Sequence, residues 1–154
     1  MATTVTAADL TVTVTESYTL NGVAYGNTIN KSFSNYVLQK EWQKKKKRIM
    51  NVSTSDPRII NFGAADEAGQ VTVGDFKYFR ITNLDDTNFV MLTLYNGADS
   101  FFYKLAAGDV FLLMSNDMDA IASSTSFGAF ADITQIKADA DTAACDIEIL
   151  TVTT

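Results

Sequence analysis

The sequence predicts an all-β protein, a single-domain antiparallel β-sandwich of the jelly-roll-like kind with eight to ten short strands. Short apolar or alternating runs recur along the chain, and turn residues separate them at intervals of about 8–12 residues. No stretch with helical periodicity lies between these runs, which disfavours a parallel α/β fold. The 154 residues, 47% hydrophobic and 19% charged, fit one folded domain. We expect a flexible N-terminal arm over residues 1–9 and the sandwich over residues 10–154.

The first expected strand covers residues 10–20, where apolar side chains alternate with Thr and Ser at a period of two. This period is typical of a strand with one buried face. Glu16 falls on the apolar side of the alternation, so we expect a β-bulge or a strand end near it. Asn21-Gly22 then supplies the positive φ angles of a tight hairpin turn, and a second strand over residues 23–29 returns beside the first.

Residues 34–50 are compatible with two structures. A helix capped by Ser34 would place Trp42 and other apolar residues on one face, but four consecutive lysines would then surround much of it. We prefer the alternative, a strand or extended loop that runs into residues 49–52.

Seven further strands are expected in the rest of the chain. They are Arg58–Phe62, Phe76–Leu84, Phe89–Tyr95, Phe101–Leu105, Val110–Met114, Ile133–Lys137 and Cys145–Val152. The runs 89–95 and 110–114 are almost continuously apolar, as in strands buried on both faces. We expect the aromatic residues between Phe76 and Phe111 to fill the core. Cys145 is expected to be a small buried hydrophobic residue on an inward-facing strand position.

The net charge of −6 is unevenly distributed. Residues 31–48 carry seven Lys and Arg against one acid, Glu41, which gives +6, whereas residues 49–154 carry five against fifteen acids, which gives −10. An acidic body repels nucleic acid and anionic membranes, so we expect neither as a partner. The run Lys44, Lys45, Lys46, Lys47 and Arg48 is the candidate docking site for an acidic protein surface. The alternative is a solvated edge or loop, since lysines protect sheet edges from aggregation.

Composition also excludes most catalytic chemistry. The chain has no His and one Cys, so it cannot build an internal disulfide, a Cys/His zinc site or a His-assisted nucleophile. The acidic segments 116–119 and 139–141 do not follow the calcium-loop pattern, because Ala143 and Ala144 stand where that pattern needs an oxygen ligand and a glycine. We therefore expect no enzymatic activity, no cofactor and no bound metal.

Two stretches carry a family resemblance. Residues 78–88 read Tyr-Phe-Arg-Ile-Thr-Asn-Leu-Asp-Asp-Thr-Asn and lead into a strand, and residues 102–113 contain the turn Lys-Leu-Ala-Ala-Gly-Asp between two strands. Together with the closing segment 138–148, this order resembles that of small β-sandwich structural proteins of tailed-bacteriophage particles. The resemblance covers about half of the chain, roughly residues 77–150, and contains no chemical motif. It implies a non-enzymatic virion protein, assembled in the host cytoplasm.

Within that resemblance, we expect a capsid decoration (cement) protein that binds the major capsid protein or other virion proteins, associates with itself and braces the shell. One alternative is a neck, tail or fibre-base component of the same particle. Another is a receptor- or carbohydrate-binding β-sandwich, for which Trp42, Tyr25 or Tyr103 would supply the aromatic platform.

Overall fold

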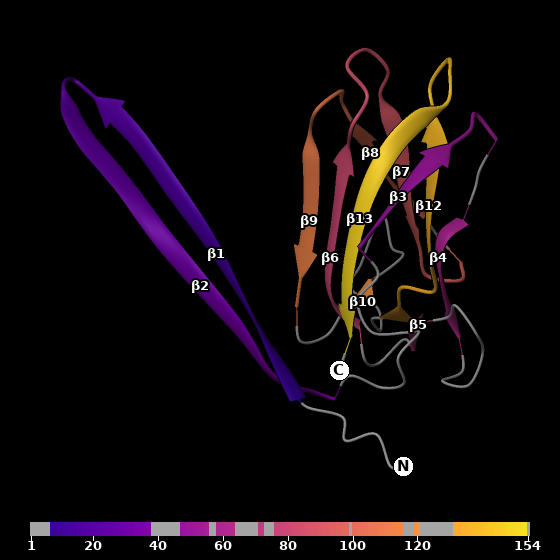
Figure 1. Cartoon of the computed structure of the whole chain (residues 1–154), viewed down its shortest axis with the longest axis horizontal. Helices are drawn as coiled ribbons and strands as arrows, with labels where there is room; N and C mark the ends of the chain where they lie inside the picture. Colours follow the sequence, from indigo (N-terminus) through magenta and orange to yellow (C-terminus); the bar gives the residue numbers. More distant parts are fainter. Residues whose placement is uncertain are drawn as a thin grey trace. The chain divides into compact units, whose positions relative to one another are not determined.

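The computed structural model describes residues 7–37, 47–55, 58–63, 71–72, 76–98, 100–115, 119–120 and 131–153. Every regular element in these ranges is a β-strand, so the predicted all-β class is confirmed (Figure 1). The chain divides into two compact units, Met1–Gln39 and Lys40–Thr154. The first unit contains a hairpin, and the second contains the sandwich.

The hairpin joins strand β1 (Ala7–Leu20) to strand β2 (Val23–Val37) in one antiparallel pair. Asn21 and Gly22 form the predicted turn, with φ angles of 51° and 80°. Such angles fit the right-handed twist of the flanking strands. The second strand continues well beyond residue 29, where we expected it to end. The only irregularity of register lies between Ala8 and Leu10, so the expectation of a bulge or strand end near Glu16 is wrong.

The hairpin forms a two-stranded sheet of its own, in which β1 and β2 pair with each other. The sequence predicts that residues 10–37 belong to the sandwich, and the structure differs from this prediction. An alternating strand has the same pattern whether its apolar face meets a second sheet or not, and the pattern therefore cannot distinguish the two cases. Residues 7–9 of the expected flexible arm belong to β1, and residues 1–6 lie outside the described part of the chain.

The larger sheet of the sandwich has the strand order β5-β4-β12-β7-β8. Its strands are β5 (Val71–Thr72), β4 (Arg58–Gly63), β12 (Gln135–Ala140), β7 (Val90–Tyr95) and β8 (Ser100–Leu105). All neighbours are antiparallel except the short β4–β5 pair, which is parallel. No residue of β7 is exposed, in agreement with its continuous apolar sequence.

The smaller sheet has the order β3-β13-β6-β9 and is antiparallel throughout. Its strands are β3 (Arg48–Val52), β13 (Cys145–Thr153), β6 (Phe76–Asn83) and β9 (Val110–Met114). A separate pair joins β10 (Asp119–Ala120) to β11 (Ala131–Asp132). The preferred strand in residues 34–50 is confirmed for residues 34–37 and 48–50, and residues 38–46 lie outside the described ranges.

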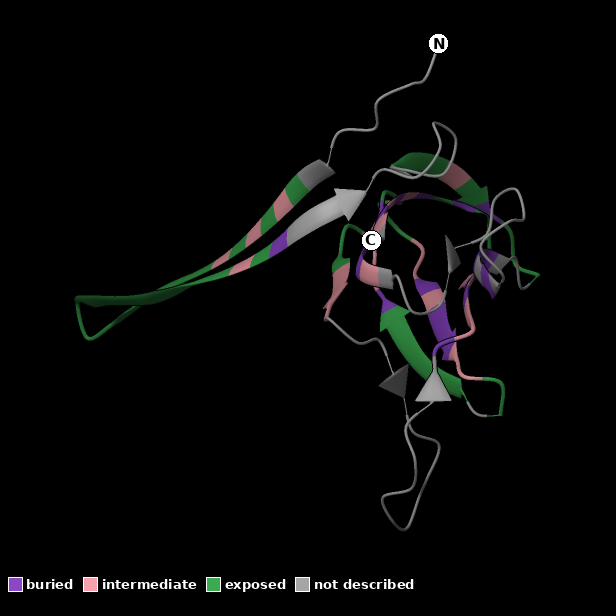
Figure 2. Cartoon of the chain, turned by 90° about the horizontal axis from the view of Figure 1, so that it is seen from below, coloured by how far each residue is buried: buried purple, intermediate pink, exposed green. Residues whose placement is uncertain are grey.

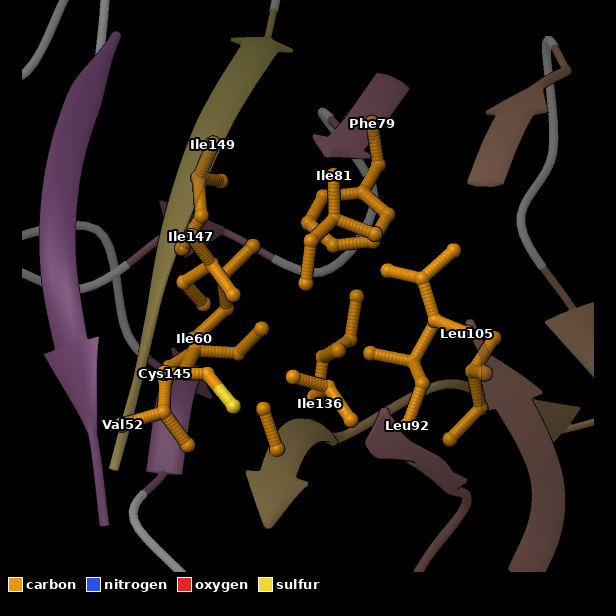
Figure 3. Packing of buried hydrophobic residues seen from close by; sticks show 14 of the residues in the cluster. Val52, Ile60, Phe79, Ile81, Leu92, Leu105, Ile136, Cys145, Ile147 and Ile149 are labelled. Atoms are coloured by element: carbon orange, nitrogen blue, oxygen red, sulfur yellow. The ribbon is translucent and has the colours of Figure 1, made fainter. Parts of the chain in front are cut away.

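The hydrophobic core lies between the two sheets. Phe79, Ile81 and Ile147 come from the smaller sheet and meet Leu92 and Ile136 from the larger one (Figure 3). Each of these five side chains is fully buried. Burial of one such side chain stabilises the fold by about 1.5–3 kcal/mol, so this contact is what holds the sheets together.

The core is smaller than the sequence predicts, because the aromatic residues of β8 do not enter it. Phe101 and Phe102 are 57% and 60% exposed, whereas Phe79 on β6 is buried. Strand β9, expected to be buried on both faces, has an exposed Val110 and is otherwise half-buried. Both strands lie at the ends of their sheets, where a strand has a neighbour on one side only.

Candidate functional site

The predicted basic docking run is only partly described by the structure. Lys44, Lys45 and Lys46 lie outside the described residues. Lys47 is 62% exposed and forms an ion pair with Glu148, its Nζ lying 3.1 Å from Oε2. The Arg48 guanidinium donates a hydrogen bond to the backbone oxygen of Ile59. The two described cations of the run therefore both contact their own chain.

Glu148 is the centre of a three-residue charge cluster on the outer face of the smaller sheet. Its second carboxylate oxygen accepts a hydrogen bond from Arg80, at 2.5 Å, and Arg80 also contacts the Thr82 hydroxyl at 3.1 Å. The hydrogen bonds from Lys47 and then from Arg80 lower the pKa of Glu148 below its ordinary value. The cluster joins β6, β13 and the residue before β3, which gives it a role in holding these strands together.

One face of the hairpin is polar and consists almost entirely of Thr, Ser and Asn side chains. Cross-strand hydrogen bonds link Thr13 to Asn30, at 2.8 Å, and Thr11 to Ser32, at 3.3 Å. Such cross-strand pairs are the unit of stabilisation in a sheet. This face is typical of a surface that stays in water.

The other face, which we call the apolar face, is made of six cross-strand rows. Directly opposed residues of an antiparallel pair share a face, which defines its members from the register. The rows are Leu10/Phe33, Val12/Lys31, Val14/Ile29, Glu16/Asn27, Tyr18/Tyr25 and Leu20/Val23. Nine of these twelve side chains are apolar, and only Glu16, Asn27 and Lys31 are not.

The apolar face is uncovered over most of its length (Figure 2). Tyr18 and Leu20 are 58% and 57% exposed, and Val23, Tyr25 and Ile29 are exposed to a similar degree. The rings of Tyr18 and Tyr25 stack with their centroids 5.4 Å apart. At the opposite end of the face, Phe33 is only 4% exposed. Contiguous exposed apolar surface of this kind marks interaction sites in folded proteins.

The length of the hairpin also indicates that the apolar face is an interaction site. A two-stranded hairpin in water is marginally stable by itself, because its single layer buries little apolar surface. Here the strands are 14 and 15 residues long, which is far above the usual five or six. Covering the apolar face with another protein surface would bury these side chains and so stabilise a hairpin of this length.

A second group of exposed aromatic residues lies at the β8–β9 edge of the sandwich. Phe101 and Phe102 are exposed, and the ring of Tyr103 packs against Phe111 of β9 with centroids 4.9 Å apart. Lys104 lies over the Phe89 ring, 4.4 Å from its centroid. This edge has fewer exposed apolar residues than the hairpin, and two of its aromatic rings already contact neighbouring side chains.

The motif that carries the family resemblance has a structural role. Asn83 is fully buried, and its side-chain amide donates hydrogen bonds to the backbone oxygens of Asn88, Leu105 and Ala106. Its side-chain oxygen accepts a hydrogen bond from the Asp85 backbone amide at 3.1 Å. One side chain therefore fastens the loop after β6 to the turn between β8 and β9.

Asp85 completes the same loop. Its Oδ1 accepts hydrogen bonds from the backbone amides of Thr87 and Asn88, at 2.9 and 2.7 Å. These bonds, that from Asn88 first, lower the pKa of Asp85. The Asn-Leu-Asp-x-Thr-Asn segment is thus a turn whose polar side chains bond to the backbone and to one another, and Asn88 also accepts a hydrogen bond from Thr142.

No metal or nucleophile site is found within the described ranges. They contain no group of three or more Cys, Asp or Glu side chains that could hold a metal ion. Cys145 is fully buried, as expected. Burial and then the charge of Asp85 raise the pKa of its thiol, which disfavours the reactive thiolate form.

Comparisons with known proteins identify no relative of this chain: no family model, no curated protein and no solved structure matches it. Among the described residues there is no helix that could span a membrane.

The strongest candidate site, the apolar face of the hairpin, differs from the site that the sequence predicted. The alternation of residues 10–20 does indicate an apolar face, but it gives no sign that this face lies outside the sandwich core. Of the aromatic platform residues considered for a carbohydrate site, Trp42 lies outside the described residues, and Tyr25 and Tyr103 belong to different units.

Proposed function

We propose that the chain is a non-enzymatic structural protein of a virus particle, and that it acts as a capsid decoration protein of a tailed bacteriophage. In this role it binds the assembled shell, with the major capsid protein as its partner, and stabilises the shell by binding linkage. The particle is assembled in the host cytoplasm. The described residues offer a large binding surface and no catalytic constellation, which supports a binding role over an enzymatic one.

The observation that carries this proposal is the uncovered apolar face of the hairpin. The aromatic pair Tyr18 and Tyr25 lies near the turn, between the aliphatic row Leu20/Val23 and the polar row Glu16/Asn27. Tyr is enriched at the centre of protein interfaces, where it combines a large apolar area with a polar group. A compact sandwich with a long hairpin is suited to joining one subunit of an assembly to another.

The family resemblance supplies the more specific part of the proposal. Its motif residues hold the loops of a β-sandwich together through Asn83 and Asp85, which is consistent with a structural protein that carries no active site. The net charge of −6 disfavours packing against nucleic acid inside a shell and favours a position on its outer surface.

Quantitative mass spectrometry of purified particles tests this function. Particles from the source culture are isolated on a density gradient, and copies of this chain are counted per copy of the major shell protein. A ratio near one, or a simple fraction of one, is expected for a protein that tiles the capsid. A chain found only in the soluble fraction would overturn the proposal.

The same count separates the first alternative from the leading one. A neck, tail or fibre-base component forms a small ring, so it would be present at only about one to a few copies per hundred shell subunits.

A carbohydrate-binding module is the second candidate, favoured by the exposed Tyr103 and by the stacked tyrosines of the hairpin. Sugar sites combine an aromatic platform with a few converging polar groups. Trp42 fluorescence that responds to host glycans, and is unchanged by unrelated sugars, would favour this function over shell binding.

A further inference from the structure

We propose that the apolar face of the hairpin is covered by the same face of a second copy, related to it by a two-fold axis parallel to the strands. The inference rests on the proposed function in one respect, since both treat this face as a protein interface. It assigns this face to a contact between two copies of the chain, so that the contact with the shell falls to other surfaces of the pair, and it adds the geometry of the contact.

The exposed fractions of the side chains show which part of the apolar face is left uncovered within one chain. Every residue from Thr15 to Asn30 is exposed, whereas Lys31 is half-buried and Phe33 is buried. The uncovered part therefore reaches from the turn to the middle of the hairpin. It contains the apolar rows Leu20/Val23 and Tyr18/Tyr25 and then the polar row Glu16/Asn27. It ends at the Val14/Ile29 row, where Ile29 is exposed and Val14 is half-buried.

A two-fold axis along the strands places β1 of one copy over β2 of the other, at the same height. Tyr18 then lies over Tyr25 of the second copy, and Leu20 lies over its Val23. In the polar row, the Glu16 carboxylate lies over the Asn27 amide, an acceptor over a donor, and the same pair occurs again on the other side of the axis. Each exposed apolar row is covered by an exposed apolar row.

Each alternative arrangement of two hairpins produces an unfavourable contact. Sliding one copy by one row places the Glu16 carboxylate of one copy on the tyrosine row and that of the other on the Val14/Ile29 row, which leaves buried charges without a partner. Reversing one copy about the Glu16/Asn27 row places β1 over β1, so two Glu16 carboxylates oppose each other. Reversing it about the Val14/Ile29 row brings the exposed Tyr25 over Phe33, which is already buried.

The area of the face is sufficient for a stable dimer. Five half-exposed large side chains, at on the order of 100 Å² each, give on the order of 1,000 Å² over the two copies. Specific interfaces begin at about this total, and the smaller residues and backbone add to it. The face is thus complementary to itself in area, in apolar character and in its single polar row.

Sedimentation of the purified full chain tests the dimer. We expect a mass twice the 16.8 kDa of one chain, and Tyr18→Lys should weaken association by roughly tenfold or more. The matched control is Ser17→Lys, which places the same charge one residue away on the polar face and should leave the dimer intact. Circular dichroism confirms that both variants keep the β fold. A monomeric wild-type chain across the micromolar range, or equal effects of the two variants, would overturn the inference.

Spin labels on the polar face test the direction of packing. Labels are attached in separate samples at Thr11→Cys and Thr19→Cys, and the native Cys145 does not compete because it is buried. Parallel packing predicts equal distances between the two copies at both positions. Reversal about the Glu16/Asn27 row would make the axial offsets differ by roughly 14 Å, at about 3.4 Å per residue, and unequal distances would contradict the proposed axis.

The failure of this inference and the failure of the proposed function are distinguishable. If the chain is present on particles but the pure protein is monomeric, and Tyr18→Lys binds particles normally, then the dimer is wrong and the function stands. If the pure protein is a dimer that responds to Tyr18→Lys but the chain is absent from particles, the function is wrong and the interface stands.

Discussion

Tyr18 and Tyr25 stack across the hairpin at a centroid separation of 5.4 Å, while both rings remain about half exposed to solvent. A stacked aromatic pair contributes about 0.5–1.5 kcal/mol beyond its buried area, so it stiffens the hairpin without covering it. The pair therefore holds a rigid aromatic surface in place before any partner arrives. Less side-chain entropy is then lost when the partner binds.

Gly26 should be essential for the hairpin and irrelevant to the sandwich. A Cβ at this position would collide with the backbone oxygen of Glu16 on the opposite strand, so Gly26→Ala must push the strands apart. We expect faster amide hydrogen exchange in β1 and β2 and an unchanged exchange rate in β13. Thr28→Ala, two positions along the same strand, is the matched control and should change neither. Uniform loss of protection over the whole chain would contradict the division into two units.

Asn83→Ala should destabilise the sandwich strongly. The substitution removes a hydrogen bond from three backbone oxygens, of which that of Ala106 keeps a bond from the Asp109 amide, and it removes the acceptor of the Asp85 amide. Each buried group left unsatisfied costs about 1–3 kcal/mol. We expect the free energy of unfolding, measured in urea, to fall by about 3 kcal/mol. Asn96→Ala removes a side-chain oxygen from the more exposed turn after β7 and should cost about 1 kcal/mol or less. Equal losses would mean that Asn83 does not fasten the two loops.

Acid should weaken the sandwich through Glu148 and Asp85. Both carboxyl groups have a pKa below the ordinary value in the folded chain. Their stabilising contribution is therefore complete above the ordinary pKa of about 4 and is lost as the pH falls through the folded-state pKa. The urea midpoint should drop as the pH falls below about 4.

Glu148→Gln isolates one part of this acid sensitivity. The variant lacks the ion pairs with Lys47 and Arg80, so it should be less stable than wild type at pH 7 and should lose less stability on acidification. A pH profile parallel to that of wild type would exclude Glu148 as a contributor.

Alanine substitution of two isoleucines compares what a core residue and a residue of the hairpin face contribute to the free energy of unfolding. Ile147 is fully buried between the sheets, and Ile29 is exposed on the apolar face of the hairpin. Ile147→Ala should cost about 2–5 kcal/mol of unfolding free energy. In dilute protein, Ile29→Ala should change stability by no more than about 0.5 kcal/mol. A large loss from Ile29→Ala in the monomer would show that the hairpin face is already covered within one chain.

Much of the local structure was predictable from the sequence. Asn21-Gly22 fixed the hairpin turn, the apolar run 89–95 indicated a strand without exposed residues, and Cys145 was correctly placed in the core. These features depend on turn geometry and on side-chain alternation, which adjacent residues determine.

The prediction failed where the outcome depends on which strands become neighbours. The alternation of residues 10–20 indicated one apolar face but not whether a second sheet covers it. The aromatic residues of β8 looked like core residues, yet β8 became an edge strand and Phe101 and Phe102 stayed exposed. The basic run shows the same limit, since the ion pair of Lys47 with Glu148 joins residues about a hundred positions apart.

Hydroxyl-radical footprinting of Tyr18 and Tyr25 over a dilution series tests the hairpin interface most directly. Tyr95, a half-buried tyrosine of the sandwich, serves as the internal reference in the same sample. We predict that oxidation of both hairpin tyrosines falls several-fold as the protein is concentrated, while oxidation of Tyr95 is constant. Oxidation rates of Tyr18 and Tyr25 that are the same at every concentration would contradict the claim that a second copy covers this face.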